Sequence, residues 1–211
     1  MHGVGGREEV GHGLPTTLPG PTQAAPLVHS YFKREVGSVA RAQLHFGEYS
    51  KLPKPTSQAA QRGLRYEKKV LSHLLKTFGN RLVAGPLFTF KEEGYYLTGK
   101  GHPYPPARKA YPDALLFSSD YRAVCVVECK FRHTGDAWHQ LNKFYLPIVR
   151  AALPWFRVCV LEVVASYDPS QRLPQPVAFV NDVNEAFATR EAFHPVYVLT
   201  ERELRNDRGL G

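Results

Sequence analysis

The sequence predicts an α/β domain in which a mixed central sheet is flanked by helices. Between 57 and 78, apolar residues recur at three- and four-residue spacing, the period of an amphipathic helix. A compact apolar run at 111–117 and longer runs rich in valine at 121–131 and 155–165 have the length and composition of buried strands. A second helical pattern at 136–152 separates the last two runs, so helices and strands are mixed along the chain.

Turn and capping signals bound the first of these elements. Gly79-Asn80 follows the first helix and is a usual signal for its C-terminal end. Ser118-Ser119-Asp120 is typical of a turn, and it separates the runs at 111–117 and 121–131. These two strands are therefore expected to form an antiparallel hairpin.

The second helix sets how the next strand joins the sheet. We expect it to begin at Thr134 or Asp136 and to kink at Pro147, which lacks a backbone N–H. Because a helix connects 121–131 to 155–165, these two strands should pair in parallel. The near-continuous apolar run at 155–165 predicts a central position in the sheet.

The remaining segments complete the predicted chain. We expect, in order, a short helix or docking strap at 31–49, a first core strand at 81–90 with Gly85-Pro86 as a bulge or edge feature, a loop or hairpin at 91–109, a strand at 177–180, a short helix at 182–193, a last strand at 195–199 and a capping box from Thr200 to Glu203. The chain is thus divided into a mobile N-terminal arm with a docking segment (1–56), a core (57–165) and a C-terminal extension of the same domain (166–211).

Composition limits the class of protein. The chain has 211 residues, 43% of them hydrophobic and 12% aromatic, which suits one globular domain. No apolar run approaches the ~20 residues that span a bilayer, and Met1–Gly6 lacks the apolar region of a secretory signal. We therefore expect an intracellular protein without a membrane partner, whether cytoplasmic, organellar or nuclear. The three cysteines predict no disulfide framework, although Cys125, Cys129 and a histidine are a conceivable zinc site.

The positive charge is concentrated in one part of the chain. The net charge is +8, and residues 51–110 hold 12 Lys and Arg against 3 Asp and Glu. A localised basic surface attracts phosphate backbones. The alternative is a solvated helix face that only keeps the protein soluble.

Three polar residues stand out on the predicted hairpin. Asp113 opens the first strand, and Glu128 and Lys130 end the second, where a period of two places them on one face. Charges beside a core need a partner or a metal. Two carboxylates suit Mg²⁺, which can activate water for attack on a phosphodiester while a lysine stabilises the developing charge. The alternative is an ordinary hairpin in which Asp113 starts a turn and the other two form an ion pair.

Pro112-Asp113 followed by Glu128-Cys129-Lys130 resembles the motif of the PD-(D/E)XK nuclease superfamily. The resemblance covers residues 57–165 and implies a restriction-endonuclease-like αβββαβ core. It also implies that Asp113 and Glu128 bind Mg²⁺ or Mn²⁺ with the carbonyl of Cys129, and that Lys130 positions or activates the attacking water.

Two further matches resemble RecB-like members of the superfamily. Gly63 and Glu67 are similar to a glycine-then-glutamate element on the first helix, and Gln140 is similar to the glutamine of a Gln-x-x-x-Tyr element. Phe144 stands where tyrosine is usual, and Tyr145 comes one place late. The resemblance implies that Glu67 completes the acidic cluster and that Gln140 orients Lys130 or a phosphate. From the helix pattern alone, Glu67 could equally be a stripe-edge residue paired with a neighbouring cation.

Aromatic and cationic residues alternate ahead of Asp113. Aromatic faces can stack on unpaired bases while cations hold the backbone, although a packed, proline-stiffened loop would look similar. The candidate nucleic-acid-binding residues are Arg65, Lys68, Lys69, Tyr96, Lys100, His102, Arg108, Lys109 and Tyr111.

The sequence therefore predicts a Mg²⁺- or Mn²⁺-dependent nuclease, with DNA as the expected substrate and Glu67, Asp113, Glu128, Lys130 and Gln140 as catalytic residues. One alternative is a catalytically silent nucleic-acid-binding or assembly module on the same fold, in a nucleoprotein complex or a virus particle. Another is a sugar-phosphate or nucleotide enzyme that uses the same metal chemistry. The N-terminal arm or the C-terminal extension could bind a protein partner.

Overall fold

The computed structural model describes residues 36, 38–46, 57–92, 108–170 and 172–206. The elements in chain order are β1 (Val39–His45), α1 (Gln58–Phe78), η2 (Gly79–Arg81), β2 (Leu82–Ala84), β3 (Leu87–Glu92), β4 (Arg108–Ala110), β5 (Ala114–Phe117), β6 (Ala123–Lys130), α2 (Gly135–His139), η4 (Gln140–Tyr145), α3 (Leu146–Ala152), β7 (Arg157–Val164), β8 (Val177–Val180), η5 (Val183–Phe187), β9 (His194–Val198) and α4 (Glu203–Asn206). None of the helices in these ranges is long and apolar enough to cross a membrane.

The strands form a large mixed sheet and a small antiparallel one. The large sheet has the order β2-β5-β6-β7-β9-β8, and the small sheet has the order β1-β3-β4. Strands β2, β5 and β6 pair antiparallel, whereas β6 with β7, β7 with β9 and β8 with β9 pair parallel. The predicted hairpin, the parallel pairing and the internal position of β7 are thereby confirmed.

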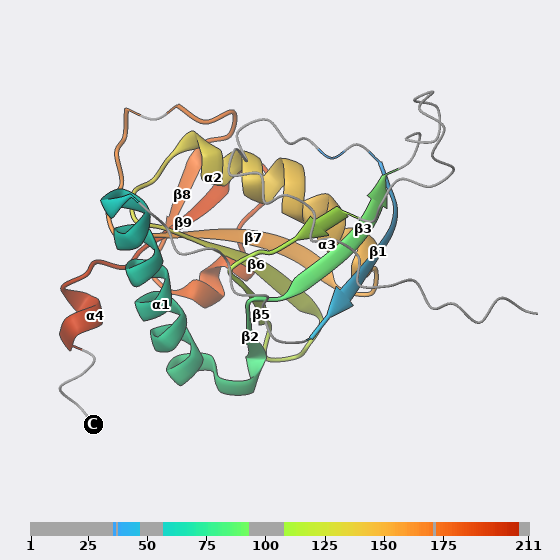
Figure 1. The fold of residues 1–211 in the computed structure, drawn as a ribbon, viewed down its shortest axis with the longest axis horizontal. Helices are drawn as coiled ribbons and strands as arrows, with labels where there is room; N and C mark the ends of the chain where they lie inside the picture. The colour runs from blue at the N-terminus through green and yellow to red at the C-terminus, as the bar shows by residue number, and fades with distance from the viewer. Residues whose placement is uncertain (1–35, 37, 47–56, 93–107, 171, 207–211) are drawn as a thin grey trace, which may run out of the picture.

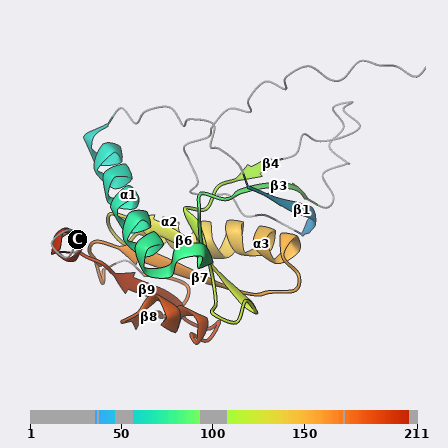
Figure 2. The same ribbon diagram turned by 90° about the horizontal axis from the view of Figure 1, so that it is seen from below.

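Helices cover both faces of the large sheet. Helix α1 packs on one face, and the α2–η4–α3 segment packs on the other, as Figure 1 shows. The small sheet lies on the far side of α3, so that α3 is enclosed between two sheets (Figure 2). The chain is thus an α/β fold with a mixed sheet flanked by helices, as the sequence predicts.

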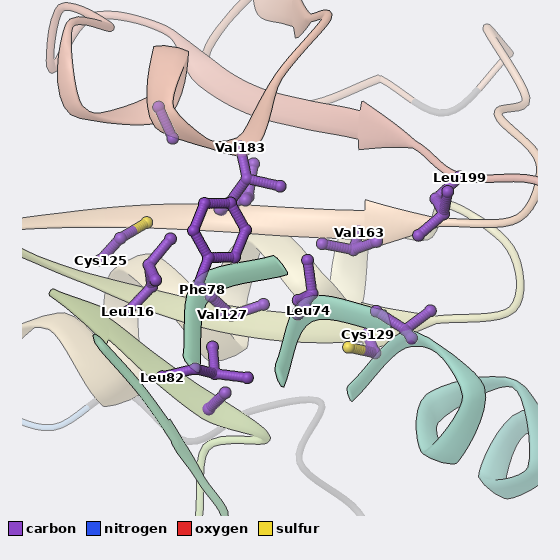
Figure 3. Close-up of a cluster of buried hydrophobic side chains, with 14 of the residues drawn as sticks. Leu74, Phe78, Leu82, Leu116, Cys125, Val127, Cys129, Val163, Val183 and Leu199 are labelled. Carbon is purple, nitrogen blue, oxygen red and sulfur yellow. The ribbon is translucent and has the colours of Figure 1, made fainter. Parts of the chain in front are cut away.

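Helix α1 forms for reasons that are visible in its sequence. The Oγ of Ser57 accepts a hydrogen bond from the backbone N–H of Ala60, which caps the first turn. Tyr66, Val70, Leu74 and Phe78 recur every four residues and are all buried. In Figure 3, Leu74 and Phe78 lie among side chains from the large sheet, and Val183 and Leu199 lie in the same cluster.

The predicted strand at 81–90 is wrong in one respect: it is two strands in different sheets. Leu82–Ala84 pairs with β5 in the large sheet, whereas Leu87–Glu92 pairs with β1 and β4 in the small sheet. Gly85 has φ +58°, a conformation that glycine adopts without strain, and Pro86 fixes the next turn. Gly85-Pro86 is therefore the crossing between the two sheets rather than a bulge.

Of the two alternatives predicted for 31–49, the helix is wrong, because the described part is a strand, whereas docking on the core is confirmed by the packing of Val39, Ala42 and Leu44 against the buried cluster. Along β1, the half-buried residues include Ala42 and Leu44 and alternate with exposed Arg41 and Gln43, which is the period of a strand. Most of the predicted loop at 91–109 lies outside the described residues.

The second helix is interrupted rather than merely kinked. A π-helical segment, η4, lies between α2 and α3, and Pro147 occupies the first turn of α3. Pro147 has no N–H to donate to the carbonyl of Lys143 four residues earlier. That carbonyl instead accepts a hydrogen bond from the backbone N–H of Val36 at 3.0 Å. Thr134 is the N-cap residue of α2, although its side chain makes no capping hydrogen bond.

The C-terminal extension completes the large sheet. Strand β9 inserts between β7 and β8, and the predicted helix at 182–193 is shorter than expected, a 3₁₀ turn at Val183–Phe187. The capping box is present: Glu203 Oε2 accepts hydrogen bonds from the N–H and hydroxyl of Thr200, and the N–H of Glu203 donates to Thr200 Oγ1.

Candidate active site

The hairpin of β5 and β6 sets the position of the central carboxylates. Ala114 pairs with Val127, so Asp113, one residue before β5, lies beside the end of β6. The Oδ2 of Asp113 accepts a hydrogen bond from the backbone N–H of Cys129 at 2.7 Å. The alternation along β6 buries Cys129 against α1 and leaves Glu128 and Lys130 on the opposite side, as the strand period predicts.

Lys130 joins the two elements of the site. Its Nζ lies 2.6 Å from Glu128 Oε1 and donates to Gln140 Oε1 at 3.0 Å. Burial alone would lower the pKa of Lys130, but the charges of Glu128 and Asp113 outweigh this effect and raise it. Lys130 is therefore a fixed cation whose ammonium group is held by one strand neighbour and one helical amide.

The π-helical turn brings Tyr145 to Gln140. The Nε2 of Gln140 donates to the hydroxyl of Tyr145 at 2.8 Å, and that hydroxyl donates to the carbonyl of Tyr111 at 2.7 Å. In an α-helix the residue four places after Gln140 would face it, but η4 adds one residue to the turn. The tyrosine that is one place late in the sequence thus contacts the glutamine. A chain of hydrogen bonds thus connects Lys130, through Gln140 and Tyr145, to the carbonyl of Tyr111, the residue before Pro112-Asp113.

Burial and mutual repulsion raise the pKa values of the carboxyl groups in the site. Burial is the main cause that raises the pKa of Asp113 well above its usual value, and the charges of Glu128 and Glu67 add to it. Burial likewise raises the pKa of Glu128, despite the neighbouring ammonium of Lys130. Glu128 Oε2 is buried without a hydrogen-bond partner. The site therefore holds three carboxyl groups beside one lysine, and each carboxyl is harder to ionise than in water.

Glu67 lies on α1, and its charge interacts with those of Glu128 and Lys130. Burial and then the charge of Glu128 raise its pKa, while Lys130 and Lys68 lower it. Its neighbours on the helix, Tyr66 and Val70, are buried, whereas Glu67 is half-buried at the edge of the apolar stripe. Direct contacts thus join Lys130 to Glu128 and Gln140 and fix Asp113 on the backbone of the same strand, whereas Glu67 acts on this group through its charge.

The residues present fit a hard divalent ion with few protein ligands. Within the described ranges, no group of three or more His, Cys, Asp or Glu side chains is arranged to hold a metal. Mg²⁺ commonly uses only one or two carboxylates together with water and phosphate oxygens. Asp113 and the unpartnered Oε2 of Glu128 meet that requirement. Cys129 contacts Asp113 through its backbone N–H, so a carbonyl ligand from Cys129 stays a prediction. The three cysteines are free.

The predicted nucleic-acid-binding residues have different surroundings. Arg65, Lys68 and Lys109 are exposed. Lys69 lies 3.6 Å from Glu201, and the guanidinium of Arg108 lies over the Phe90 ring. Tyr111 is half-buried and contributes its carbonyl to Tyr145. Tyr96, Lys100 and His102 lie outside the described residues.

A buried histidine network beside the site was missed in the sequence. The Oε2 of Glu162 lies 2.8 Å from His133 Nδ1 and 2.9 Å from His194 Nε2, and all three side chains are fully buried. Burial would raise the pKa of Glu162, but these two hydrogen bonds lower it. Glu162 is the register partner of Glu128 on β7. A carboxylate inside the apolar run at 157–164 was the one available signal, and nothing in the sequence identified its partners.

No family model, curated protein or solved structure matches this chain.

Proposed function

We propose that this chain is a metal-dependent nuclease with a restriction-endonuclease-like core of the PD-(D/E)XK type. The observation that carries the proposal is the arrangement of Lys130, which is held between Glu128 and Gln140 while Asp113 is fixed on the backbone of the same strand. The order α1, β2, β5, β6, the α2–η4–α3 segment and β7 supports the core, with β3 and β4 inserted before β5.

Each side chain has a role that its surroundings suit. Asp113 and Glu128 would hold Mg²⁺ or Mn²⁺, with Glu67 adding negative charge from α1. When bound, the ion lowers the pKa of a water and polarises the phosphate. Lys130 would orient that water, and Gln140 and Tyr145 would keep the ammonium in place. Exposed Arg65 and Lys68 on α1 would attract the phosphate backbone of the substrate, which we expect to be DNA.

The direct test is cleavage of end-labelled single-stranded, duplex and flapped DNA, with Mg²⁺, with Mn²⁺ and with chelator. We expect metal-dependent cleavage by the wild type and at least about a hundredfold loss of rate in Lys130→Ala, because the variant lacks the cation that would orient the attacking water. Each factor of ten in rate corresponds to ~1.4 kcal/mol of barrier. An RNA of the same sequence identifies the preferred substrate.

Two further variants make the result interpretable. Lys76→Ala changes an exposed lysine at the far end of α1 and should cleave like the wild type. Asp113→Asn keeps an oxygen for the N–H of Cys129 and should fold yet lose activity. Cleavage at the wild-type rate by both Lys130→Ala and Asp113→Asn contradicts the proposal.

The second candidate is a nucleic-acid-binding or assembly module that performs no cleavage. The observation that favours it is the 2.6 Å ion pair between Lys130 and Glu128, which could serve only to neutralise a buried carboxylate. Titration with Mg²⁺ and Mn²⁺ by calorimetry separates the two. Saturable binding that Asp113→Asn removes supports the nuclease, whereas no binding at millimolar metal supports the module.

A further inference from the structure

A cavity away from the candidate active site has a charged rim. It has a volume of about 550 Å³ and lies between the η4–α3 segment, the first half of β7 and the chain from η5 to β9. Val158, which lines it, precedes Glu162, the register partner of Glu128, by four residues, or about 13 Å along a strand. The volume is within the range of small-molecule sites.

The charges around this cavity favour an anion. Its lining contains four cationic side chains, Lys143, Arg150, Arg157 and Arg190, and one carboxylate, Glu191. Glu191 Oε1 is already 2.6 Å from Arg150 Nη2, and Arg157 donates to the carbonyl of Phe187. Lys143 and Arg190 are exposed and, among the residues that the structure describes, form no ion pair. The ammonium of Lys143 lies 5.9 Å from the centre of the Trp138 ring, which also lines the cavity. Neither cation is therefore neutralised by a carboxylate of the described residues, and both face an anionic ligand uncompensated.

The remaining surface of the cavity suits a flat apolar ring. Val158, Val160 and Pro195 line it, together with Phe193, whose side chain is 39% exposed. An exposed aromatic face beside cations is a typical surface for a stacked base.

The two walls of the cavity are already connected. The indole N–H of Trp138 donates to Gln175 Oε1 at 3.2 Å, and Gln175 Nε2 donates to the carbonyl of Glu191 at 3.1 Å. Gln175, which precedes β8, therefore links α2 to the loop before β9, so hydrogen bonds within the protein hold these two walls together. A preformed site loses less entropy on binding than one that must be ordered.

We propose that this cavity binds a nucleoside phosphate, with the base beside Phe193 and the phosphate between Lys143 and Arg190. The ligand is either a free nucleotide or one unit of a single strand, since both present the same base and phosphate. The proposal does not depend on hydrolysis at Asp113 and Glu128.

The test is calorimetry with the full chain in chelator, so that binding is measured without turnover. The probes are adenosine monophosphate, adenosine, inorganic phosphate and a short single-stranded oligonucleotide of adenine. We expect saturable binding of the monophosphate and at least about tenfold weaker binding of adenosine and of phosphate, because each lacks one half of the contacts.

Charge reversal assigns the binding to this cavity. Lys143→Glu and Arg190→Glu should each weaken the monophosphate about tenfold. Arg41→Glu, an exposed cation on β1, is the matched control and should bind like the wild type. Lys130→Ala should also retain binding, which separates this proposal from the nuclease proposal.

The oligonucleotide identifies the source of the ligand. Binding more than about tenfold tighter than the monophosphate, with the same loss in Lys143→Glu and Arg190→Glu, assigns the cavity to a strand, and equal affinity assigns it to a free nucleotide. Three results overturn the proposal: no saturation at millimolar monophosphate, phosphate binding as tightly as the monophosphate, or equal weakening by Arg41→Glu.

Discussion

At the scale of single residues, ionisation of the buried carboxyl groups in the site is unfavourable. The pKa of Asp113 is raised, chiefly by burial, so its contribution to stability is present below its unfolded pKa and is lost as pH rises through the folded value. At neutral pH, without metal, the raised pKa of Asp113 therefore lowers the stability of the fold relative to acid pH. Functional sites often carry such a cost.

Asp113→Asn should consequently stabilise the metal-free protein. We expect a free energy of unfolding higher by about 0.5–2 kcal/mol at neutral pH, because the amide removes the charge and keeps an acceptor for Cys129. Thermal melting in chelator measures the difference, which should shrink in acid. Mg²⁺ should raise the melting temperature of the wild type and leave that of the variant unchanged. A variant that melts below the wild type in chelator refutes the account of unfavourable ionisation.

The Tyr145 hydroxyl gives a second prediction at this scale. Tyr145→Phe removes the link between Gln140 and the carbonyl of Tyr111, so Gln140 should hold Lys130 less well. We expect a loss of about 1–3 kcal/mol in stability, the usual cost of unpaired buried polar groups, and about a tenfold loss in cleavage rate. Tyr121→Phe, on an exposed tyrosine, is the control. Unchanged cleavage and stability in Tyr145→Phe would show that the hydroxyl is dispensable.

The residues of the site were partly readable in the sequence. Asp113, Glu128 and Lys130 were found because a strand alternates its faces and because charges beside an apolar run need a reason. Tyr145 was discounted, since the α-helical period does not show that a π turn adds a residue. His133 and His194 were missed because they are 61 positions apart in the sequence and meet only through Glu162.

At the scale of elements, Gly63 inside α1 and Gly79 at its C-terminal end have different backbone conformations. Gly79 ends the helix at φ +55°, a conformation that other residues adopt at a cost, whereas Gly63 lies inside the helix. A Cβ at either position would meet no atom within 4 Å. The backbone conformation alone, and not the space for a side chain, therefore determines how a substitution at each glycine changes stability.

Gly79→Ala should destabilise the fold by about 1 kcal/mol, and Gly63→Ala should stabilise it by about 0.5–1 kcal/mol. Chemical denaturation of the two variants beside the wild type measures both effects. Gly63→Ala also tests the resemblance at this position: cleavage at the wild-type rate would show that the glycine itself is not required. Equal stability changes of one sign in both variants would contradict the backbone argument.

The periods of α1, β6 and β7 extend over several turns or residues and identify each element. The short strands predicted at 177–180 and 195–199 are also confirmed, as β8 and β9. The run at 81–90 carried a break at Gly85-Pro86, but nothing in it showed that the two halves enter different sheets, because that choice depends on which strands lie beside them. Strand β1 was ambiguous for the same reason, since its pairing with β3 joins distant parts of the chain.

At the scale of the whole molecule, the C-terminal extension is structurally required. Strand β9 pairs with β7, and His194 supplies one of the two partners of buried Glu162. A chain that ends at residue 165 would leave the edge of β7 open and the carboxylate half-satisfied. Removing one partner of a buried pair costs about 3–5 kcal/mol, a large part of the ~5–15 kcal/mol that stabilises a domain.

We therefore expect the chain ending at residue 165 to be insoluble or unfolded, as measured by circular dichroism and by gel filtration. His194→Gln within the full chain isolates the network from the strand and should lower the melting temperature while the protein still folds. A soluble, cooperatively melting 1–165 chain would show that the core is independent.

The insertion of β9 between two earlier strands also has a consequence for synthesis. Strands β7 and β8 leave the ribosome before the strand that separates them, so each presents an unpaired edge until residues 194–198 have emerged. The nascent chain is then exposed to mispairing and to chaperone capture. A translational pause shortly after β8 would lengthen that interval, and synonymous codons in this stretch would alter the soluble yield without changing any amino acid.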